Sequence, residues 1–335
     1  MNCVRTSSLG AQKNKSFWFA DSMSSPKVSV IIITFNHENY IRECLEGALN
    51  QDTPFEYEIL VADDASTDRT SEIVAHLSAR STSVSVRHLR AEKNRGLMGN
   101  VIEALPQTRG KYLAICEGDD YWCDQRKLRK QVAVLEEHPD RAMCTHECFK
   151  RQYPPGTGRN MRKGVSMVLR DIQLFGIRRG SQLGIEFLRN RERFWDNERA
   201  SPDRRRTDVI DMRAIYDTGF LPASPSIVMR RDVVFPVPDC FRISDGHHHM
   251  SIMLAALNGG VVHLKDVMAV KRDQESSFTK SFARKNANKK RSMVLETNEK
   301  IKRWTCLLDM ARTAEDRDLL KKMIAQEKRK YHFSG

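Results

Sequence analysis

The sequence lacks the long apolar runs that mark membrane proteins. Its longest run, Val28 to Phe35, has eight residues and includes Ser29 and Thr34, whereas a membrane-spanning helix needs about twenty apolar residues. The polar N-terminal tail, residues 1–26, has only the short apolar patch 17–20 and so lacks the core of a secretory signal. We therefore expect a cytoplasmic protein. The polar tail also favours Met23 as the working start, with residues 1–22 dispensable.

Paired cysteine spacings are absent as well. The eight cysteines form no CxxC pair, and the chain is large enough to fold without disulfides. We expect most of them to be reduced and buried. Cys144, His146 and Cys148 lie close enough in sequence for a zinc site, but their alternation is also typical of a strand, which is the interpretation we favour.

Two nucleotide-binding fingerprints are missing. The chain has neither the GxxxxGK[ST] pattern of P-loop proteins nor the GxGxxG pattern of dinucleotide-binding units. A phosphorylated ligand would therefore need a different source of positive charge, and a divalent metal is the one we expect.

Positive charge is in excess and indicates an anionic partner. The formal net charge is +13 and the pI is about 9.4, which favours nucleic acid, an acidic membrane surface or nucleotide phosphate. Signatures of nucleic-acid binding are missing, so we expect no nucleic-acid partner. The basic segment 276–335 predicts peripheral contact with an anionic membrane. The alternative is a helix that packs on the core through Ile301, Trp304 and Leu308.

Hydrophobic periodicity predicts an α/β fold with a doubly wound, mainly parallel sheet, because short apolar runs alternate with helical spacing up to about residue 150. The expected strands cover 28–35, 57–62, 84–89 and 111–116. The expected helices begin near 41, 70, 97 and 128. In the second half we expect strands at 226–229 and 261–264, helices at 185–195 and 250–257, and helical structure after 276.

Polar residues follow the four expected strands or lead into the next helix. They are Thr34, Phe35, Asn36, Asp63, Asp64, Asn94, Arg95, Gly96, Glu117, Asp119 and Asp120. In doubly wound sheets, ligands bind outside the carboxyl ends of the strands. We therefore expect these residues to converge on one edge of the sheet.

The carboxylates among these residues have specific uses. Asp63 or Asp64 would accept hydrogen bonds from a nucleotide base or ribose, or would cap the following helix. The charges of Glu117, Asp119 and Asp120 repel one another unless a cation compensates. Oxygen ligands of this kind select Mg²⁺ or Mn²⁺, held jointly with substrate phosphates. The alternative is a polar turn or capping cluster.

Four segments resemble family 2 glycosyltransferases, which have the GT-A fold. They are KVSVIIITFNHENYIRECLEGALNQ (Lys27 to Gln51), EILVADDASTDRT (Glu58 to Thr70), NRGLMGN (Asn94 to Asn100) and GKYLAICEGDDYWCDQRKLRKQV (Gly110 to Val132). One such motif alone would be weak, but four in order at ordinary family spacing are specific. The resemblance is strong over roughly the first 150 residues.

The resemblance implies roles for the residues that match it. Thr34, Phe35 and Asn36 correspond to the first nucleotide contact, and Asp63 or Asp64 to the carboxylate that holds the base. The loop of Asn94, Arg95 and Gly96 corresponds to the one beside the ribose and donor. Glu117 to Asp119 stands where the family has its DxD motif, with Glu117 near the ribose, Asp119 as the first metal ligand and Asp120 as the second.

In the second half the similarity is weaker. Asp245 matches the position of the family's catalytic base; the alternative is that it caps the helix that follows. His247, His248 and His249 follow it, and consecutive positions on a helix cannot converge on one ion. We expect acceptor contact or packing from them, with His247 or His249 as the alternative base. Where the family has Tyr-Arg followed by His, this chain has Lys271 to Gln274.

The resemblance also implies an organisation and a reaction. Residues 27–150 would form the nucleotide-sugar-binding core, 151–275 the acceptor-binding and catalytic region with an Arg-rich start, and 276–335 a helical extension. The expected reaction is inverting transfer of a sugar from a nucleoside-diphosphate sugar, with UDP preferred, to an acceptor hydroxyl on a glycan or lipid-linked saccharide of the cell surface. The alternative is a catalytically weak relative that binds the donor without turnover.

Overall fold

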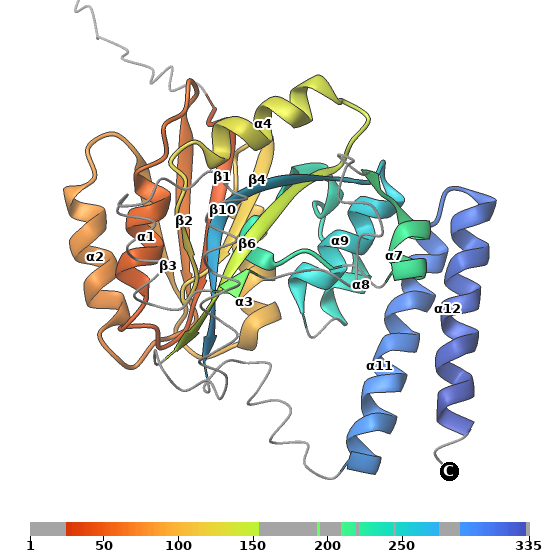
Figure 1. The fold of residues 1–335 in the computed structure, drawn as a ribbon. Coiled ribbons are helices and arrows are strands. Elements are labelled where there is room, and N and C mark those ends of the chain that lie inside the picture. Colours follow the sequence, from red (N-terminus) through yellow and green to blue (C-terminus); the bar gives the residue numbers. More distant parts are fainter. Residues whose placement is uncertain are drawn as a thin grey trace, which may run out of the picture.

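Within the residues that the structure describes, one mixed sheet of ten strands organises the fold (Figure 1). The structure, a computed structural model, describes residues 25–153, 193–194, 209–218, 221–243, 246–274 and 289–332. The strands are β1 (Val28–Thr34), β2 (Tyr57–Asp63), β3 (Ser85–Arg90), β4 (Tyr112–Glu117), β5 (Tyr121–Trp122), β6 (Met143–Tyr153), β7 (Arg193–Phe194), β8 (Val209–Ile210), β9 (Val228–Arg230) and β10 (Val261–Gln274). The helices are α1 (Ile41–Leu49), α2 (Thr70–Arg80), α3 (Gly96–Ala104), α4 (Lys127–Glu137), α7 (Met212–Thr218), α8 (Asp239–Arg242), α9 (His247–Leu257), α11 (Lys289–Met310) and α12 (Ala314–His332).

The strand order gives the sheet a parallel half and a mixed half. Neighbouring strands follow the order β3-β2-β1-β4-β9-β6-β10-β5, with β7 beside β6 and β8 beside β10. The first four in this order are parallel to one another. Strand β9 runs antiparallel between β4 and β6, and β10 is parallel to β6. Strands from the second half of the chain therefore continue the sheet that the first half begins.

Helices cover both faces of the sheet, as parallel strands that are apolar on both sides require. All seven residues of β1 are buried. Val30 and Ile32 pack with α1, α2 and α4, whereas Ile31 and Ile33 pack with α3, α8 and α9 on the other face. The predicted doubly wound, mainly parallel α/β architecture is confirmed.

In the first half the predicted elements agree with the structure to within about two residues. Helix α1 is buried through Ile41, Cys44, Leu45 and Ala48, which recur at the spacing of one helical face. The cysteines behave as expected, because all seven in the described ranges are free thiols and five of them are buried.

The segment that suggested zinc is part of a buried strand. Cys144, His146 and Cys148 all lie within β6 and are buried. In the part of the chain that the structure describes, no group of three or more His, Cys, Asp or Glu side chains is placed to hold a metal ion. The strand interpretation is therefore confirmed.

Two expectations for the second half were wrong. Arg193 and Phe194, inside the helix predicted at 185–195, form β7, because their backbone pairs with β6; the rest of that prediction lies outside the described residues. Strand β10 has fourteen residues and continues far beyond the predicted 261–264, because β6 offers a pairing partner along its length.

The two C-terminal helices, α11 and α12, lie side by side against the rest of the molecule (Figure 1). Trp304 and Leu307 of α11 and Leu319 and Leu320 of α12 are buried in the core that also contains α8 and α9. The alternative prediction, a helix packed on the core, is therefore confirmed for this segment. No helix in the described ranges has both the length and the apolar character needed to cross a bilayer.

Candidate active site

Polar residues from three parallel strands lie together at one edge of the sheet. Thr34 of β1 is level with Asp63 of β2, and Ile33 of β1 is level with Glu117 of β4. On the other side of β2, Asp63 is level with Arg90 of β3. The sheet register therefore brings the predicted polar strand ends to the edge where ligands of such sheets bind.

The turn after β1 is tied to the turn after β2. Asn36 has a left-handed backbone with φ of 55°, and its side-chain oxygen accepts a hydrogen bond from Thr67 N at 2.8 Å. Thr34 is buried, with Oγ1 3.2 Å from His37 Nδ1. Phe35 is 41% exposed. The Asn36 side chain thus holds the turn, and Phe35 presents an aromatic ring to solvent.

Asp63 is a buried carboxylate whose acceptor sites are taken by the protein. Its Oδ1 accepts a hydrogen bond from Ser66 N at 2.9 Å. Its Oδ2 accepts one from Ser71 Oγ and lies 3.3 Å from His88 Nε2. Burial alone would raise the pKa of Asp63, but these hydrogen bonds outweigh burial and hold the pKa well below its ordinary value. Asp63 therefore anchors the turn and the first part of α2.

Asp64 positions the predicted loop before α3. Its Oδ1 accepts a hydrogen bond from Arg95 N at 2.7 Å, and its own N–H donates to Thr34 O at 3.0 Å. In that loop Gly96 has a left-handed φ of 76°, and its N–H donates to Asn94 Oδ1 at 3.0 Å. The loop of Asn94, Arg95 and Gly96 therefore lies beside Asp64.

The acidic cluster, defined as Glu117, Asp119 and Asp120, lies where β4 ends and β5 begins. Gly118 packs so closely on β1 that an added Cβ would lie 2.7 Å from Thr34 Oγ1. This contact fixes the cluster against the end of β1. Glu117 and Asp119 are half-buried, and Asp120 is buried.

His247, the first residue of α9, contacts the cluster from the second half of the chain. It is fully buried, and its Nε2 lies 3.1 Å from Glu117 Oε1. Because an ionised carboxylate can only accept, Nε2 is the donor. Burial alone would raise the pKa of Glu117, but the hydrogen bond from His247 and the charge of Lys271 lower the pKa overall. Burial lowers the pKa of the neighbouring His248 to about 3.

Lys271 of β10 brings a positive charge to the cluster. Its Nζ lies 3.6 Å from Asp120 Oδ2 and 3.4 Å from Ser224 Oγ. Burial alone would lower the pKa of Lys271, but Asp120, Glu117 and Asp119 together raise the pKa above its ordinary value. Burial raises the pKa of Asp120, and the charge of Lys271 opposes that rise. Lys271 is therefore a cation at neutral pH.

Arg272 fastens the turn that carries the cluster. Its backbone N–H donates to Asp120 Oδ1 at 2.7 Å, and its guanidinium donates to Asp119 O at 2.6 Å and pairs with Glu43 of α1. The guanidinium also lies over the ring of Tyr121, 4.6 Å from its centroid. One arginine thus connects β10, α1 and the acidic turn.

The residues present fit a metal ion that is shared with a phosphorylated ligand. Glu117 Oε2 and Asp120 Oδ2 are buried acceptors without a hydrogen-bond partner, and the carboxylates of the site outnumber Lys271 and Arg272. Asp120 is buried, accepts a hydrogen bond from Arg272 N and pairs with Lys271, whereas Asp119 is only half-buried, so Asp119 is the better placed ligand. A site with few protein carboxylates is typical of Mg²⁺ that is also coordinated by substrate phosphates.

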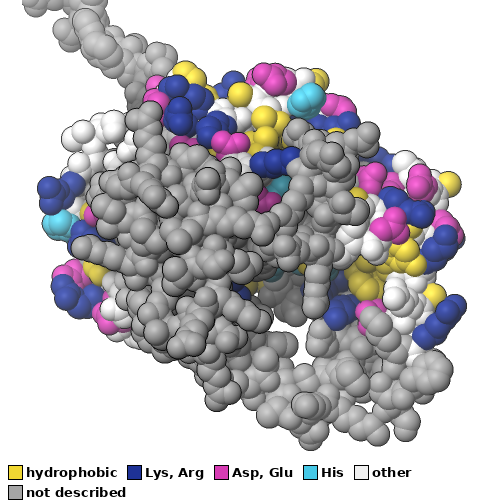
Figure 2. Space-filling model, viewed as in Figure 1, with side chains coloured by type: hydrophobic (Ala, Val, Ile, Leu, Met, Phe, Trp, Pro, Cys, Tyr) yellow, Lys and Arg dark blue, Asp and Glu magenta, His cyan; other side chains and the backbone are white. Residues whose placement is uncertain are grey.

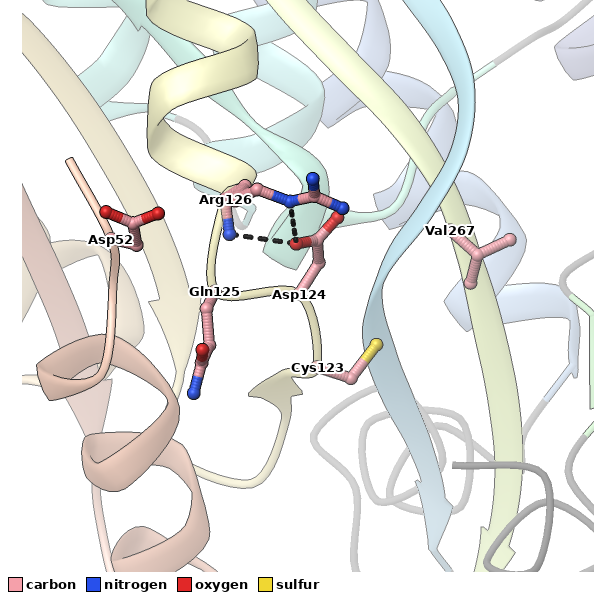
Figure 3. A pocket seen from close by; sticks show the side chains of 6 residues that line it. All are labelled: Asp52, Cys123, Asp124, Gln125, Arg126 and Val267. Carbon is pink, nitrogen blue, oxygen red and sulfur yellow. Dashed lines mark hydrogen bonds and ion pairs between the residues drawn. The ribbon is translucent and has the colours of Figure 1, made fainter. Parts of the chain in front are cut away.

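A pocket with a volume of about 410 Å³ lies elsewhere (Figure 3). It is lined by Asp52, Cys123, Asp124, Gln125, Arg126 and Val267, none of which belongs to the acidic cluster. Asp124 pairs with Arg126 and with Lys130, whose Nζ lies 2.9 Å from Asp124 Oδ2, and Asp52 pairs with Arg129. We therefore place the candidate site at the strand ends and not in this pocket.

Some predictions fall outside the described residues, and some site residues were missed. Asp245, the predicted base, is not described, although α9 begins two residues after it. Nearly all of the Arg-rich stretch 151–206 is also outside the described residues.

His247 and Lys271 were not predicted to contact the cluster. The charged residues of the otherwise apolar strand β10 could have predicted the contact of Lys271, because a buried charge in such a strand needs a partner.

Comparison with known proteins assigns the chain to a family. The family model for glycosyl transferase family 2 matches residues 29–199. The chain belongs to glycosyl transferase family 2. The match includes the acidic cluster and the strand ends described above, and the predicted membership is thereby confirmed.

Relatives support this membership over the first part of the chain. The protein Rv1520 of Mycobacterium tuberculosis is 44% identical over 119 residues, which is 36% of this chain and 34% of that protein. The poly(ribitol-phosphate) β-N-acetylglucosaminyltransferase TarS of Staphylococcus aureus is 36% identical over 116 residues, or 33% of this chain and 19% of TarS. The chain thus spans about a third or less of the length of these two relatives.

Solved structures share the fold over most of the chain. The structure of S. aureus TarS residues 1–349 matches with a TM-score of 0.55 at 20% identity, covering 92% of this chain and 72% of that one. The mannosyltransferase PcManGT of Pyrobaculum calidifontis, in complex with GDP-Man and Mn²⁺, matches with a TM-score of 0.54 at 16% identity, covering 90% and 70%. At these identities the likeness concerns the fold.

Proposed function

We propose that this member of the family transfers a sugar from a nucleoside-diphosphate sugar to an acceptor hydroxyl, with inversion at the anomeric carbon. The observation that carries the proposal is the acidic cluster, held beside Thr34 and Asp64 at the carboxyl ends of adjacent parallel strands. That edge is where α/β sheets bind ligands. Its mixture of hydrogen-bonding strand ends and carboxylates suits a nucleotide with a metal-bound diphosphate.

We assign the nucleoside to the strand ends of β1 and β2. Asp64 is the better candidate for the base because the oxygens of Asp63 are already engaged by Ser66, Ser71 and His88. The exposed ring of Phe35 can stack on a base, since aromatic faces accept any base. Asn36 contributes by holding this turn in place.

We assign the diphosphate to the acidic cluster. Asp119 would hold Mg²⁺ or Mn²⁺, with Glu117 beside the ribose. The ion, when bound, supplies positive charge to the leaving diphosphate. Asp120 positions this ligand, because it accepts a hydrogen bond from Arg272 N and pairs with Lys271 and so fixes the turn on which Asp119 lies.

We assign the acceptor proton to Asp245. A carboxylate at this point of the chain, just before α9, would accept the proton as the hydroxyl attacks, a contribution typically worth about 10²–10⁴-fold in rate. His247 is a weaker candidate because it is fully buried and already donates to Glu117. Asp245→Asn should bind donor normally and lose most turnover, whereas His249→Ala should retain turnover; the opposite pattern would assign the base to His249.

The donor and acceptor are proposals guided by the relatives. TarS is named as a β-N-acetylglucosaminyltransferase of poly(ribitol-phosphate) and has been solved with UDP-GlcNAc, and PcManGT was solved with GDP-Man. UDP-sugars are therefore the first donors to test and GDP-sugars the second. A glycan or lipid-linked saccharide of the cell surface is the acceptor class that we propose.

A screen of nucleotide-sugars for thermal stabilisation, with and without Mn²⁺, tests this function. A donor that binds the folded state stabilises it by RT ln(1 + [L]/Kd), about 2.7 kcal/mol at one hundred times Kd. We expect one nucleotide class to stabilise the protein and to be hydrolysed slowly. Stabilisation without any turnover would indicate the catalytically weak alternative, and no stabilisation by any donor would reject the proposal.

We further propose that α12 touches an anionic membrane. Lys321, Lys328 and Arg329 are exposed on this helix, and each basic residue near such a surface contributes about 1 kcal/mol. On the face shown in Figure 2, acidic side chains lie among the basic ones over the C-terminal helices. Contact would therefore be weak and sensitive to salt.

A further inference from the structure

The position of Lys271 is unusual for a lysine in a sheet. Strand β10 pairs with β5 next to the acidic turn, with Val270 level with Tyr121. This register places Lys271 beside Asp120. Its side chain is 29% exposed, while that of its partner Asp120 is 2% exposed. The carboxylate of the ion pair is thus buried in the protein, while the Lys271 side chain remains partly exposed.

The surroundings of Lys271 hold it in place. Its Nζ lies 3.6 Å from Asp120 Oδ2 and 3.4 Å from Ser224 Oγ. Arg272, the next residue, is buried and bound to both Asp120 and Asp119 O, so the backbone that carries Lys271 is fixed. An ammonium group held in this way is a prepared binding group for a phosphate.

We propose that Lys271 is a resident cation of the donor site, which binds the diphosphate of the nucleotide directly and allows nucleotide binding without a metal ion. The inference rests on the proposed function, because it assumes that the diphosphate lies at the acidic cluster. Without Lys271, the surplus of carboxylates that faces an anionic ligand would be larger by one charge.

Isothermal titration of the full chain with UDP and with GDP, in EDTA and in Mn²⁺, tests this inference. The parent protein should bind one nucleotide in both conditions. Lys271→Gln should weaken binding in EDTA by about 10- to 100-fold, as expected for one lost hydrogen bond to a charged group. Lys271→Arg should retain binding in EDTA. Lys111→Gln is the matched control, because Lys111 forms an exposed ion pair with Glu136 near the opposite end of β4.

Removal of Lys271 leaves the buried Asp120 without its ion-pair partner, so the double variant Lys271→Gln, Asp120→Asn is the second test. It removes both members of the pair and should show the same loss in EDTA. Unchanged affinity in EDTA for the folded variants would overturn the inference. A parent protein that binds nucleotide only with Mn²⁺ would also overturn it and leave the proposed function standing. Failure to bind either nucleotide in both conditions would reject both.

Discussion

Replacement by Asn should lower the stability of the protein at Asp63 but the affinity for nucleotide at the adjacent Asp64. In Asp63→Asn, one of the two carboxylate oxygens is replaced by an NH₂ group. That group then faces either Ser71 Oγ and His88 Nε2 or Ser66 N. A hydrogen bond to a charged group contributes about 1.5–3 kcal/mol. With one or two such bonds lost, we expect the free energy of unfolding to fall by about 2–4 kcal/mol.

The contribution of Asp63 to the free energy of unfolding depends on pH in a defined direction. Its pKa is depressed in the folded protein, so its contribution to stability is complete above the unfolded pKa of about 3.9 and is lost as the pH falls through the folded value. The stability difference between parent and Asp63→Asn should therefore be constant from pH 7 to pH 5 and should narrow below about pH 4.

Asp64→Asn should behave as a binding variant. Asn can still accept the hydrogen bond from Arg95 N through its side-chain oxygen, so we expect little change in unfolding, while affinity for the donor nucleotide falls. Urea unfolding across this pH range and nucleotide titration at pH 7 measure the two effects. If Asp63→Asn unfolds like the parent protein and loses nucleotide affinity, the assignment of the two residues is reversed.

The remaining predictions concern the metal ligand and the membrane. Asp119→Asn should lower Mn²⁺-supported turnover by about 10² or more. Asp68→Asn, which alters the acceptor of the hydrogen bond from Thr70 N at the start of α2, should leave turnover near the parent rate; equal rates for the two variants would remove Asp119 as the ligand. Replacing Lys321, Lys328 and Arg329 by Glu should abolish sedimentation with acidic liposomes at low salt and leave turnover of a soluble acceptor unchanged. Unaltered sedimentation would reject membrane contact through α12.

Local pattern was sufficient to predict the first half of the fold. The helix at α1 followed from one apolar face of Ile41, Cys44, Leu45 and Ala48, and the polar strand ends converge because parallel neighbours end at the same edge. The prediction could not separate Asp63 from Asp64, since that difference depends on Ser71 and His88, which reach Asp63 only in the folded sheet.

Contacts between distant parts of the chain could not be predicted from hydrophobic spacing. His247 is 130 residues from Glu117, and Arg272 is 152 residues from Asp120. Both contacts depend on where β9, β6 and β10 insert in the sheet, and strand order is not encoded in hydrophobic spacing. For the same reason the prediction of Asp120 as a metal ligand did not include its contacts with Arg272 N and Lys271.

The central claim is sugar transfer from a nucleotide-sugar at the acidic cluster. The most direct measurement is NMR of the reaction of the full chain with Mn²⁺ and UDP-GlcNAc, other UDP-sugars and GDP-mannose, with Asp119→Asn alongside. The account predicts that one donor releases its nucleoside diphosphate as water takes the place of the acceptor hydroxyl, that the sugar first appears with inverted anomeric configuration, and that Asp119→Asn suppresses both signals. Release with retained configuration, or no release from any donor by the parent protein, would contradict it.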